Sequence, residues 1–402
     1  MNNEPTGRPA EIKRAGSGWL VLFVLAHFGH HLLSALLTPL IPYIRDEFGL
    51  DYKKTGFLLS AFTLTYGLSH LPAGWLMAVF DPRLLIIIGV SGVALSGLLV
   101  GISPNYTMMF LAAALMGTAS GGYHPSSASL VSSSIEPRRR GWALGVHQIG
   151  GTGSHFLAPL IAAGVAAIGG WRGSFIGLSF PVFIFGLFLY TRLGKMGYRR
   201  GVSERKDTTT SESQAPISWV RITAFMVLTV VGYALIHAVV SFIPLYLVDR
   251  YSVDKGVAAA LLSLLYSAGL WAGPLGGYLS DRLGKVPVLL AGSLLLGPAF
   301  YLLTVVSYGI GIILVLLAIG ACLYARMPVS ESYIVGQTSG EKQGTLLGIY
   351  YFGSRGGPAV ITPVIGYLID RFDFNLSFIV CALGMVVVTV ICGLFLRGSE
   401  AR

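Results

Sequence analysis

The stretches ARMPVSESYIVG at 325–336 and GTLLGIYYFGSRGGPAVITP at 344–363 decide the fold, because they place charged side chains inside long apolar segments. Arg326 and Glu331 lie in the first stretch and Arg355 lies in the second. A charged side chain at bilayer depth costs about 2.5 kcal/mol or more, so it usually faces a polar cavity or a partner. We therefore interpret these three residues as the wall of a central site, surrounded by two helical bundles.

The composition is that of a membrane protein. Of 402 residues, 54% are hydrophobic and only 11% are charged, whereas about 25% of the residues in a soluble domain are charged. Apolar runs of about 20 residues, the length that crosses a hydrocarbon core, recur along the chain. Because every backbone group in lipid must be satisfied within the chain, these runs predict an all-α membrane protein with twelve transmembrane helices. The runs are 18–43, 55–80, 84–103, 106–134, 141–168, 172–193, 218–248, 256–280, 286–306, 308–336, 344–369 and 375–397.

The net charge of +10 reflects orientation in the membrane. With the N-terminus inside, most of the 28 Lys and Arg residues fall in segments that face the cytoplasm, which is the positive-inside distribution. We therefore predict a multi-pass protein of the cytoplasmic (inner) membrane with both termini in the cytoplasm, and no binding to nucleic acid. Cys322, Cys381 and Cys392 lie in apolar runs without the spacing of metal ligands, so we interpret them as core residues.

The longest polar interruption divides the chain into two halves. Residues 194–217, rich in Arg, Lys, Ser, Thr and Glu, have the composition of a flexible cytoplasmic linker. This predicts six-helix bundles at 1–193 and 218–402. An offset of 203 residues aligns the halves at seven positions, which indicates a repeat. The aligned pairs are Gly74 and Gly277, Leu76 and Leu279, Pro125 and Pro328, Gly141 and Gly344, Gly145 and Gly348, Gly150 and Gly353, and Gly153 and Gly356.

Two six-helix halves joined by a basic linker resemble the major facilitator superfamily of transporters, over essentially the whole chain. The sharpest local match is GYLSDRLGK at 277–285, which is similar to the loop signature of that superfamily. The resemblance implies that Asp281, Arg282 and Lys285 form a conformational latch on the cytoplasmic side. In the first half Ala and Val replace the acid and the base of the signature, so the resemblance implies a single intact latch.

The motif GYHP at 122–125, followed by Arg140 and a Gly-rich fifth helix, is similar to the fosmidomycin-resistance-like efflux group of that superfamily. This resemblance implies export by proton antiport. Small residues let helices in lipid approach closely, so the Gly-rich fifth and eleventh helices are expected to pack tightly against their neighbours. Pro125 and Pro328 each remove a backbone donor and are expected to bend the fourth and tenth helices.

All eight histidines lie in predicted helices. Each could donate a hydrogen bond between helices, and we assign that role to His70, His147 and His155. In the superfamily that the chain resembles, helices 1, 4, 7 and 10 line the cavity. The resemblance implies that histidines on the first three of these helices bind substrate; they are His31, His124 and His237. His124 is also a candidate for proton coupling, because His titrates near physiological pH.

The two intramembrane arginines outnumber the carboxylate beside them. At ~1.5 Å of rise per residue, Arg326 and Arg355 both lie about 15 Å from the cytoplasmic face, near the midplane. Glu331 could hold helices 10 and 11 together through an ion pair, but two guanidinium groups face this one carboxylate. Because Arg suits bidentate binding of carboxylate or phosphate, we expect both arginines, together with Tyr350, to bind an anionic substrate. Glu331 is expected to carry a coupled proton.

These features predict a secondary transporter that moves a small organic anion or zwitterion by alternating access. Proton-coupled efflux is preferred, and uptake by proton symport stays open. We expect a monomer that interacts with its substrate, protons and the bilayer, with no cofactor, no metal site and no enzymatic activity.

Two alternatives use different chemistry. A divalent-metal transporter is favoured by His27, His30 and His31, whose imidazoles suit Zn, Ni and Fe. It is opposed by the lack of Asp or Cys ligands and by the two nearby arginines. A membrane-embedded enzyme or a receptor is opposed by the twofold repeat and by the lack of a catalytic set.

Overall fold

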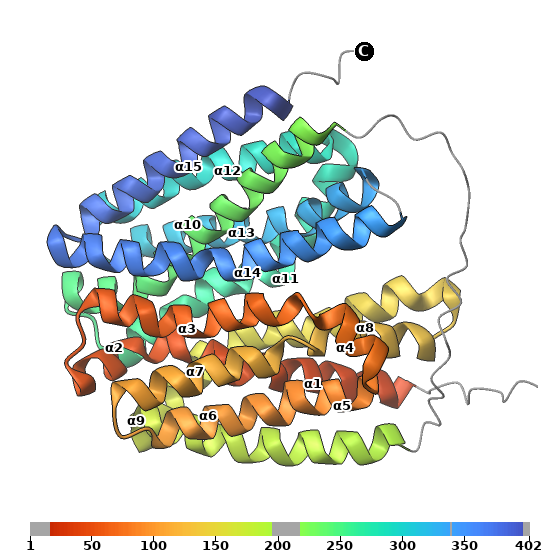
Figure 1. Ribbon diagram of the computed structural model, residues 1–402. Coiled ribbons are helices and arrows are strands. Elements are labelled where there is room, and N and C mark those ends of the chain that lie inside the picture. The colour runs from red at the N-terminus through yellow and green to blue at the C-terminus, as the bar shows by residue number, and fades with distance from the viewer. Residues whose placement is uncertain (1–16, 195–217, 338–339, 397–402) are drawn as a thin grey trace, which may run out of the picture.

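The computed structural model describes residues 17–194, 218–337 and 340–396, and these residues are almost entirely helical, without a strand (Figure 1). The N-terminal elements are α1 (Ser17–Ala35), α2 (Leu37–Phe48), α3 (Tyr52–His70), α4 (Ala73–Val79), α5 (Pro82–Ile87), a π-helical turn η1 (Ile88–Gly92), α6 (Val93–Ile102), α7 (Tyr106–Ser120), α8 (Tyr123–Ser134), a 3₁₀ turn η2 (Pro137–Arg139) and α9 (Arg140–Gly194). The C-terminal elements are α10 (Trp219–Tyr251), α11 (Lys255–Leu283), α12 (Lys285–Val305), α13 (Ile310–Gln337), α14 (Gly340–Arg371) and α15 (Phe374–Leu396). The predicted linker lies outside the described residues, except for Gly194 at the end of α9.

The elements follow the twelve predicted runs, and most of the interruptions have a local cause. The second run is divided into α3 and α4 at Pro72, which lacks a backbone donor. The fourth run is divided into α7 and α8 at Gly121, whose carbonyl the ring of Pro125 would meet four residues later. In contrast, α13 continues through Pro328. The fifth and sixth runs form the 55-residue α9, which turns at Gly170, where φ is +67°.

The described helices account for a membrane-spanning fold. Eight helical stretches are long and apolar enough to cross a membrane. The two arms of α9 on either side of Gly170 are about 45 and 36 Å long at ~1.5 Å per residue, so each can cross a core ~30 Å thick. With two crossings from α9, these eight stretches supply nine membrane crossings. The interrupted pairs α3–α4 and α7–α8, together with α14, supply the other three of the twelve predicted crossings. The three cysteines are unpaired, and Cys381 and Cys392 are buried as expected of core residues.

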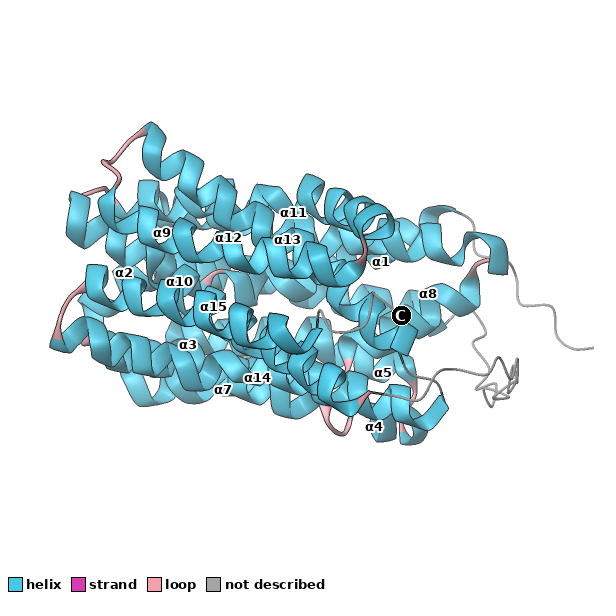
Figure 2. Ribbon diagram, turned by 90° about the horizontal axis from the view of Figure 1, so that it is seen from above, coloured by secondary structure: helices cyan, strands magenta, loops and turns pink. Residues whose placement is uncertain are grey.

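The helices gather in two groups that meet face to face. In Figure 1 the elements from α1 to α9 form the lower group and those from α10 to α15 the upper group. The groups pack mainly through α3 against α14 and α9 against α11, and Figure 2 shows the helices running along a common long axis. Glycine makes this contact possible, because a Cβ on Gly67 of α3 would lie 2.7 Å from the backbone nitrogen of Gly356 of α14.

Close packing of the Gly-rich helices is found at some glycines and not at others. On α9, Gly151 lies against α1, where an added Cβ would be 2.6 Å from His27 Nε2. On α14, Gly353 lies against α10, where an added Cβ would be 2.8 Å from a methyl carbon of Val230. Other glycines of these helices have no atom near an added Cβ, among them Gly145, Gly153 and Gly348.

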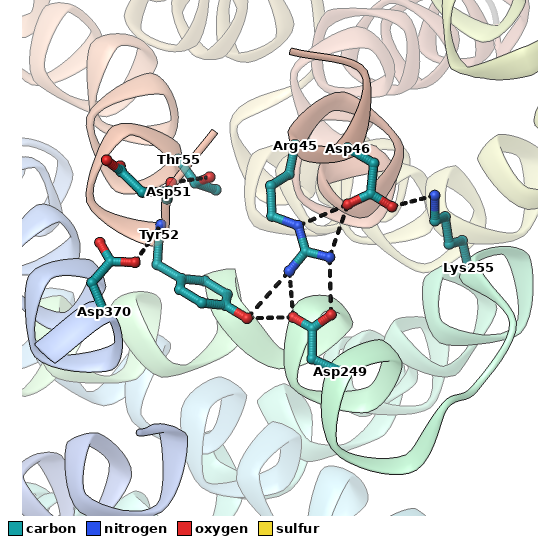
Figure 3. Close-up of polar contacts among 8 residues, drawn as sticks. All are labelled: Arg45, Asp46, Asp51, Tyr52, Thr55, Asp249, Lys255 and Asp370. Atoms are coloured by element: carbon teal, nitrogen blue, oxygen red, sulfur yellow. Dashed lines mark hydrogen bonds and ion pairs between the residues drawn. The ribbon is translucent and has the colours of Figure 1, made fainter. Parts of the chain in front are cut away.

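Polar side chains join the two groups at the end that carries the α2–α3 and α10–α11 connections (Figure 3). We call this the outer end, since the charge distribution predicts that it faces away from the cytoplasm. Arg45 donates two hydrogen bonds to Asp249, which also accepts from Tyr52 Oη at 2.6 Å. Asp46 Oδ2 lies 2.5 Å from Lys255 Nζ. Among the described residues, both ion pairs that connect the two groups lie at this end.

The N-terminus of α3 adds a backbone contact between the groups at the same end. Asp370, near the end of α14, accepts from the backbone nitrogens of Tyr52 and Lys53 at 2.9 and 2.8 Å. Asp51 accepts from the backbone nitrogen of Lys54 at 2.6 Å. The first backbone donors of a helix have no partner within it, and carboxylates stabilise its positive end. The backbone N–H groups in the first turn of α3 therefore bind one carboxylate of their own group and one of the opposite group.

Candidate functional site

Arg355 lies on α14 where the two groups of helices face each other. Its guanidinium carbon is 5.6 Å from the ring centroid of Tyr66 on α3 and 5.9 Å from that of Tyr233 on α10. Its Nη1 donates to Tyr233 Oη at 3.3 Å. The side chain is half-buried.

Arg326 has a different environment. It is 5% exposed and lies inside the C-terminal group, beside Gly232 of α10 and Gly292 of α12. Its Nη2 donates a long hydrogen bond of 3.4 Å to the carbonyl of Leu228, and its Nε has no partner among the described residues. The two arginines predicted to share a site thus contact different neighbours, and only Arg355 touches the N-terminal group.

Glu331 does not neutralise either arginine in this structure. No ion pair joins it to Arg326 or Arg355 in the described chain. It is exposed on α13, close to the hydroxyl of Tyr351, and interacts with Arg355 only at longer range. Arg355 therefore has no ion-pair partner among the described residues. Tyr350 lies buried in the C-terminal group, 5.4 Å from the Tyr351 ring.

Six histidines from three elements form one cluster in the N-terminal group. The shortest distances between ring centroids are 4.4 Å for His27 and His147, 4.7 Å for His30 and His31, 4.9 Å for His31 and His155, 5.0 Å for His27 and His31, 5.1 Å for His31 and His124, and 5.2 Å for both His27 and His30 to His124. The predicted substrate residues His31 and His124 thus meet. The cluster also takes in His147 and His155, which lie eight residues apart on one side of α9. This spacing is the feature of the sequence that could have predicted that the two rings lie on the same side of the helix.

Backbone carbonyls determine the tautomer of three of these rings. The Nδ1 atoms of His27, His30 and His147 lie 3.0, 2.7 and 3.1 Å from the carbonyls of His147, Gly89 and Phe23. A carbonyl can only accept, so each neutral ring carries its hydrogen on Nδ1 and keeps a lone pair on Nε2. Gly89 belongs to the π-helical turn η1, a type of turn common at functional sites. For His147 the predicted interhelical hydrogen bond is confirmed.

Two histidines lie outside the cluster. His70 Nδ1 donates to the carbonyl of Tyr66 in its own helix at 2.7 Å, so the predicted bond between helices is wrong for this residue. His237 lies on α10 in the C-terminal group, 3.2 Å from Ser241 Oγ and 6.2 Å from the Tyr233 ring. His237 is therefore near the Arg355 side of the site, separate from the predicted partners His31 and His124.

Three histidines come close enough together to suggest a metal site. One ring nitrogen from each of His27, His31 and His124 lies within 4.8 Å of the others. The metal alternative drawn from the sequence named His27, His30 and His31; the group that converges contains His27 and His31, with His124 in place of His30.

The predicted latch residues make contacts only within the C-terminal group. Lys285 Nζ donates to the carbonyl of Ser332 at 2.8 Å, and Arg282 lies over the ring of Tyr278, 4.6 Å from its centroid. Asp281 is exposed, and no hydrogen bond or ion pair involves its side chain in the described residues. The outer-end residues that do join the two groups were not singled out from the sequence. The repeat was the available signal, since the 203-residue offset pairs Asp46 with Asp249.

Two packed groups of membrane helices, with charged and aromatic side chains between them, define a membrane transporter. The family model of the Major Facilitator Superfamily matches residues 23–270 and 225–402. The chain belongs to this superfamily.

Individual proteins of known sequence or structure show the same relationship. The fosmidomycin resistance protein of Escherichia coli is 24% identical over 386 residues, covering 93% of each chain. The probable L-galactonate transporter of Escherichia coli is 29% identical over 182 residues, which span 45% of this chain and only 39% of that protein. The crystal structure of a bacterial homolog of the human lysosomal transporter Spinster, in an inward-facing and occupied conformation, matches with a TM-score of 0.73 and 19% identity over 94% of this chain and 96% of that one.

Proposed function

We propose that this transporter moves a small organic anion or zwitterion by alternating access, and that Arg355 binds the anionic group. The observation that carries the proposal is the position of Arg355. It is a cation between the two groups of helices, with one long hydrogen bond and no carboxylate partner in the described chain. A guanidinium group in this state keeps donors free for a bidentate contact with carboxylate or phosphate. The similarity to a probable L-galactonate transporter supports an anionic substrate.

The surroundings of Arg355 fit an anion that also carries hydroxyl or amino groups. Tyr66 and Tyr233 border the guanidinium from opposite groups of helices, and His237 offers a further polar atom on the same side. A ligand held between α3, α10 and α14 would contact both groups at once. Binding energy that differs between two arrangements of the groups is what alternating access requires.

Proton coupling is assigned to Glu331, with His124 as a second candidate. Glu331 is exposed and interacts with Arg355 through space, so its protonation alters the charge that an arriving anion meets. The similarity to the fosmidomycin resistance protein favours export by proton antiport. In the predicted orientation, with both termini in the cytoplasm, the closed outer end corresponds to an inward-facing arrangement.

The test compares two arginines of the same helix. Arg355→Lys keeps the charge and loses the planar fork, and Arg371→Lys makes the same change at the exposed end of α14. Calorimetry with L-galactonate and a panel of small carboxylates and phosphates should identify a bound anion whose affinity falls about tenfold in Arg355→Lys, equal to about 1.4 kcal/mol, and is unchanged in Arg371→Lys. Equal affinities in both variants, or no bound anion in the panel, would contradict the proposal.

A further inference from the structure

The histidine cluster contains three rings whose nitrogens converge and are not used up by hydrogen bonds. His27 and His31 are four residues apart on one face of α1, and His124 reaches the same place from α8. One nitrogen from each lies within 4.8 Å of the others. Two nitrogens bound to one tetrahedral ion at 2.0–2.1 Å are about 3.4 Å apart, so each ring would move by less than about 1 Å to bind a common ion.

The hydrogen bonds around the cluster prepare nitrogen atoms to act as ligands. His27 contacts the His147 carbonyl through Nδ1, which leaves its Nε2 with a lone pair. Metal-binding imidazoles are commonly oriented in this way by a carbonyl on the other ring nitrogen. The His31 and His124 rings have no hydrogen bond among the described residues.

Unpartnered buried atoms are the second observation. The Nε2 atoms of His27 and His124 are both buried without a partner in the described chain, and the His27 side chain is completely inaccessible. A buried polar group without a partner costs free energy, and a bound ion would offset that cost for both nitrogens at once. Two such nitrogens in one three-histidine group indicate a ligand that accepts imidazole lone pairs.

We propose that His27, His31 and His124 form a binding site for a divalent transition-metal ion of the Zn²⁺, Co²⁺ and Ni²⁺ class. These ions bind imidazole well, whereas Mg²⁺ and Ca²⁺ require oxygen ligands that the three side chains do not supply. Three protein ligands leave a coordination position open. Arg355 interacts electrostatically with His124 from the opposite group and weakens the attraction for any cation, which favours ions that gain most from imidazole.

The test uses the full-length protein in detergent, purified with a tag that contains no histidine. Zn²⁺ binding is measured by calorimetry, and Co²⁺ binding by the visible absorption of the ion, which distinguishes tetrahedral from octahedral coordination. His31→Asn and His124→Asn remove ligands without breaking a hydrogen bond recorded for their rings. His70→Asn and His237→Asn are matched controls, because both are intramembrane histidines outside the three-residue group.

We expect one Zn²⁺ per chain in the wild type. The Zn²⁺ affinity is expected to fall at least about tenfold in each ligand variant and to stay within about twofold of wild type in each control. An increase in melting temperature with Zn²⁺ should be lost in the ligand variants and kept in the controls. The proposal is overturned if the wild type binds no Zn²⁺ at micromolar concentrations, or if the control and ligand variants weaken binding equally. It is independent of anion transport, because no substrate is present in either measurement.

Discussion

Asp46 and Asp249 occupy equivalent places in the two halves, and each contacts the first residue of a helix in the opposite half. Asp46 pairs with Lys255 at the start of α11, and Asp249 accepts from Tyr52 at the start of α3. The 203-residue offset relates both acids and both partners. It also relates the two left-handed residues that end α2 and α10, Gly49 and Ser252, with φ of 58° and 52°.

Two equivalent contacts, Asp46 with Lys255 and Asp249 with Tyr52, thus join the halves at the outer end. Arg45 also binds Asp249. Because the same local geometry ends α2 and α10, the acids project at matching positions toward the opposite half. This pseudo-twofold arrangement means that neither half can rotate away without losing both contacts together.

Asp249→Asn is expected to favour separation of the outer ends. Hydrogen bonds to charged groups contribute about 1.5–3 kcal/mol, and partial exposure reduces this to about 1 kcal/mol, or about a fivefold change in population. Distances between spin labels on the α6–α7 and α12–α13 connections report the shift. Asp51→Asn is the control, since Asn caps a helix as well as Asp does and Asp51 stays within its own half. Equal distance distributions in the two variants would show that the Asp249 contacts do not hold the outer end closed.

The latch implied at the other end depends on Asp281. Its side chain is exposed in this arrangement, so it can act only when the cytoplasmic ends approach. Asp281→Asn is expected to reduce the population with those ends together, whereas Asp281→Glu keeps the charge and should restore much of it. Single-molecule distances between labels on the cytoplasmic ends of the two halves would measure this. A distribution identical to that of wild type in Asp281→Asn would remove the latch from the mechanism.

Arg326→Met is expected to raise the stability of the fold and to lower transport. A buried guanidinium with one long hydrogen bond and an unpartnered Nε is costly, so an apolar side chain of similar length is expected to stabilise the fold by about 1 kcal/mol or more. Transport is expected to fall if the charge supports anion binding. Thermal unfolding and uptake into proteoliposomes measure the two effects. A lower melting temperature would instead assign Arg326 to holding α10, α12 and α13 together.

Glu331→Gln tests proton coupling. If this carboxylate carries the coupled proton, the variant loses transport driven by a pH gradient and keeps substrate exchange at equal pH on both sides of the membrane. Proteoliposomes loaded at two pH values provide the measurement, and His124→Asn is examined in the same way. A Glu331→Gln protein that responds fully to the gradient would move the coupling role to His124 or remove it.

The sequence by itself determined the number and order of the helical runs and the repeat. Apolar length acts locally, so the runs could be located from the sequence, although Pro alone does not decide where a helix breaks: the chain is interrupted at Pro72 and continues through Pro328. The family followed from the same patterns, because a whole-chain repeat and one loop motif depend only on order along the chain. The charges of Arg326 and Arg355 could likewise be placed at membrane depth from the helical rise.

Only the tertiary structure decided which of these side chains meet. Arg326 turns into its own half while Arg355 faces the other, because helix rotation depends on packing against neighbours such as Gly232 and Gly292. His147 and His155 meet His27 and His31 because α9 packs against α1, a contact that no local pattern encodes. Contacts between distant helices depend on rotation and approach, which arise from the summed packing of the whole molecule.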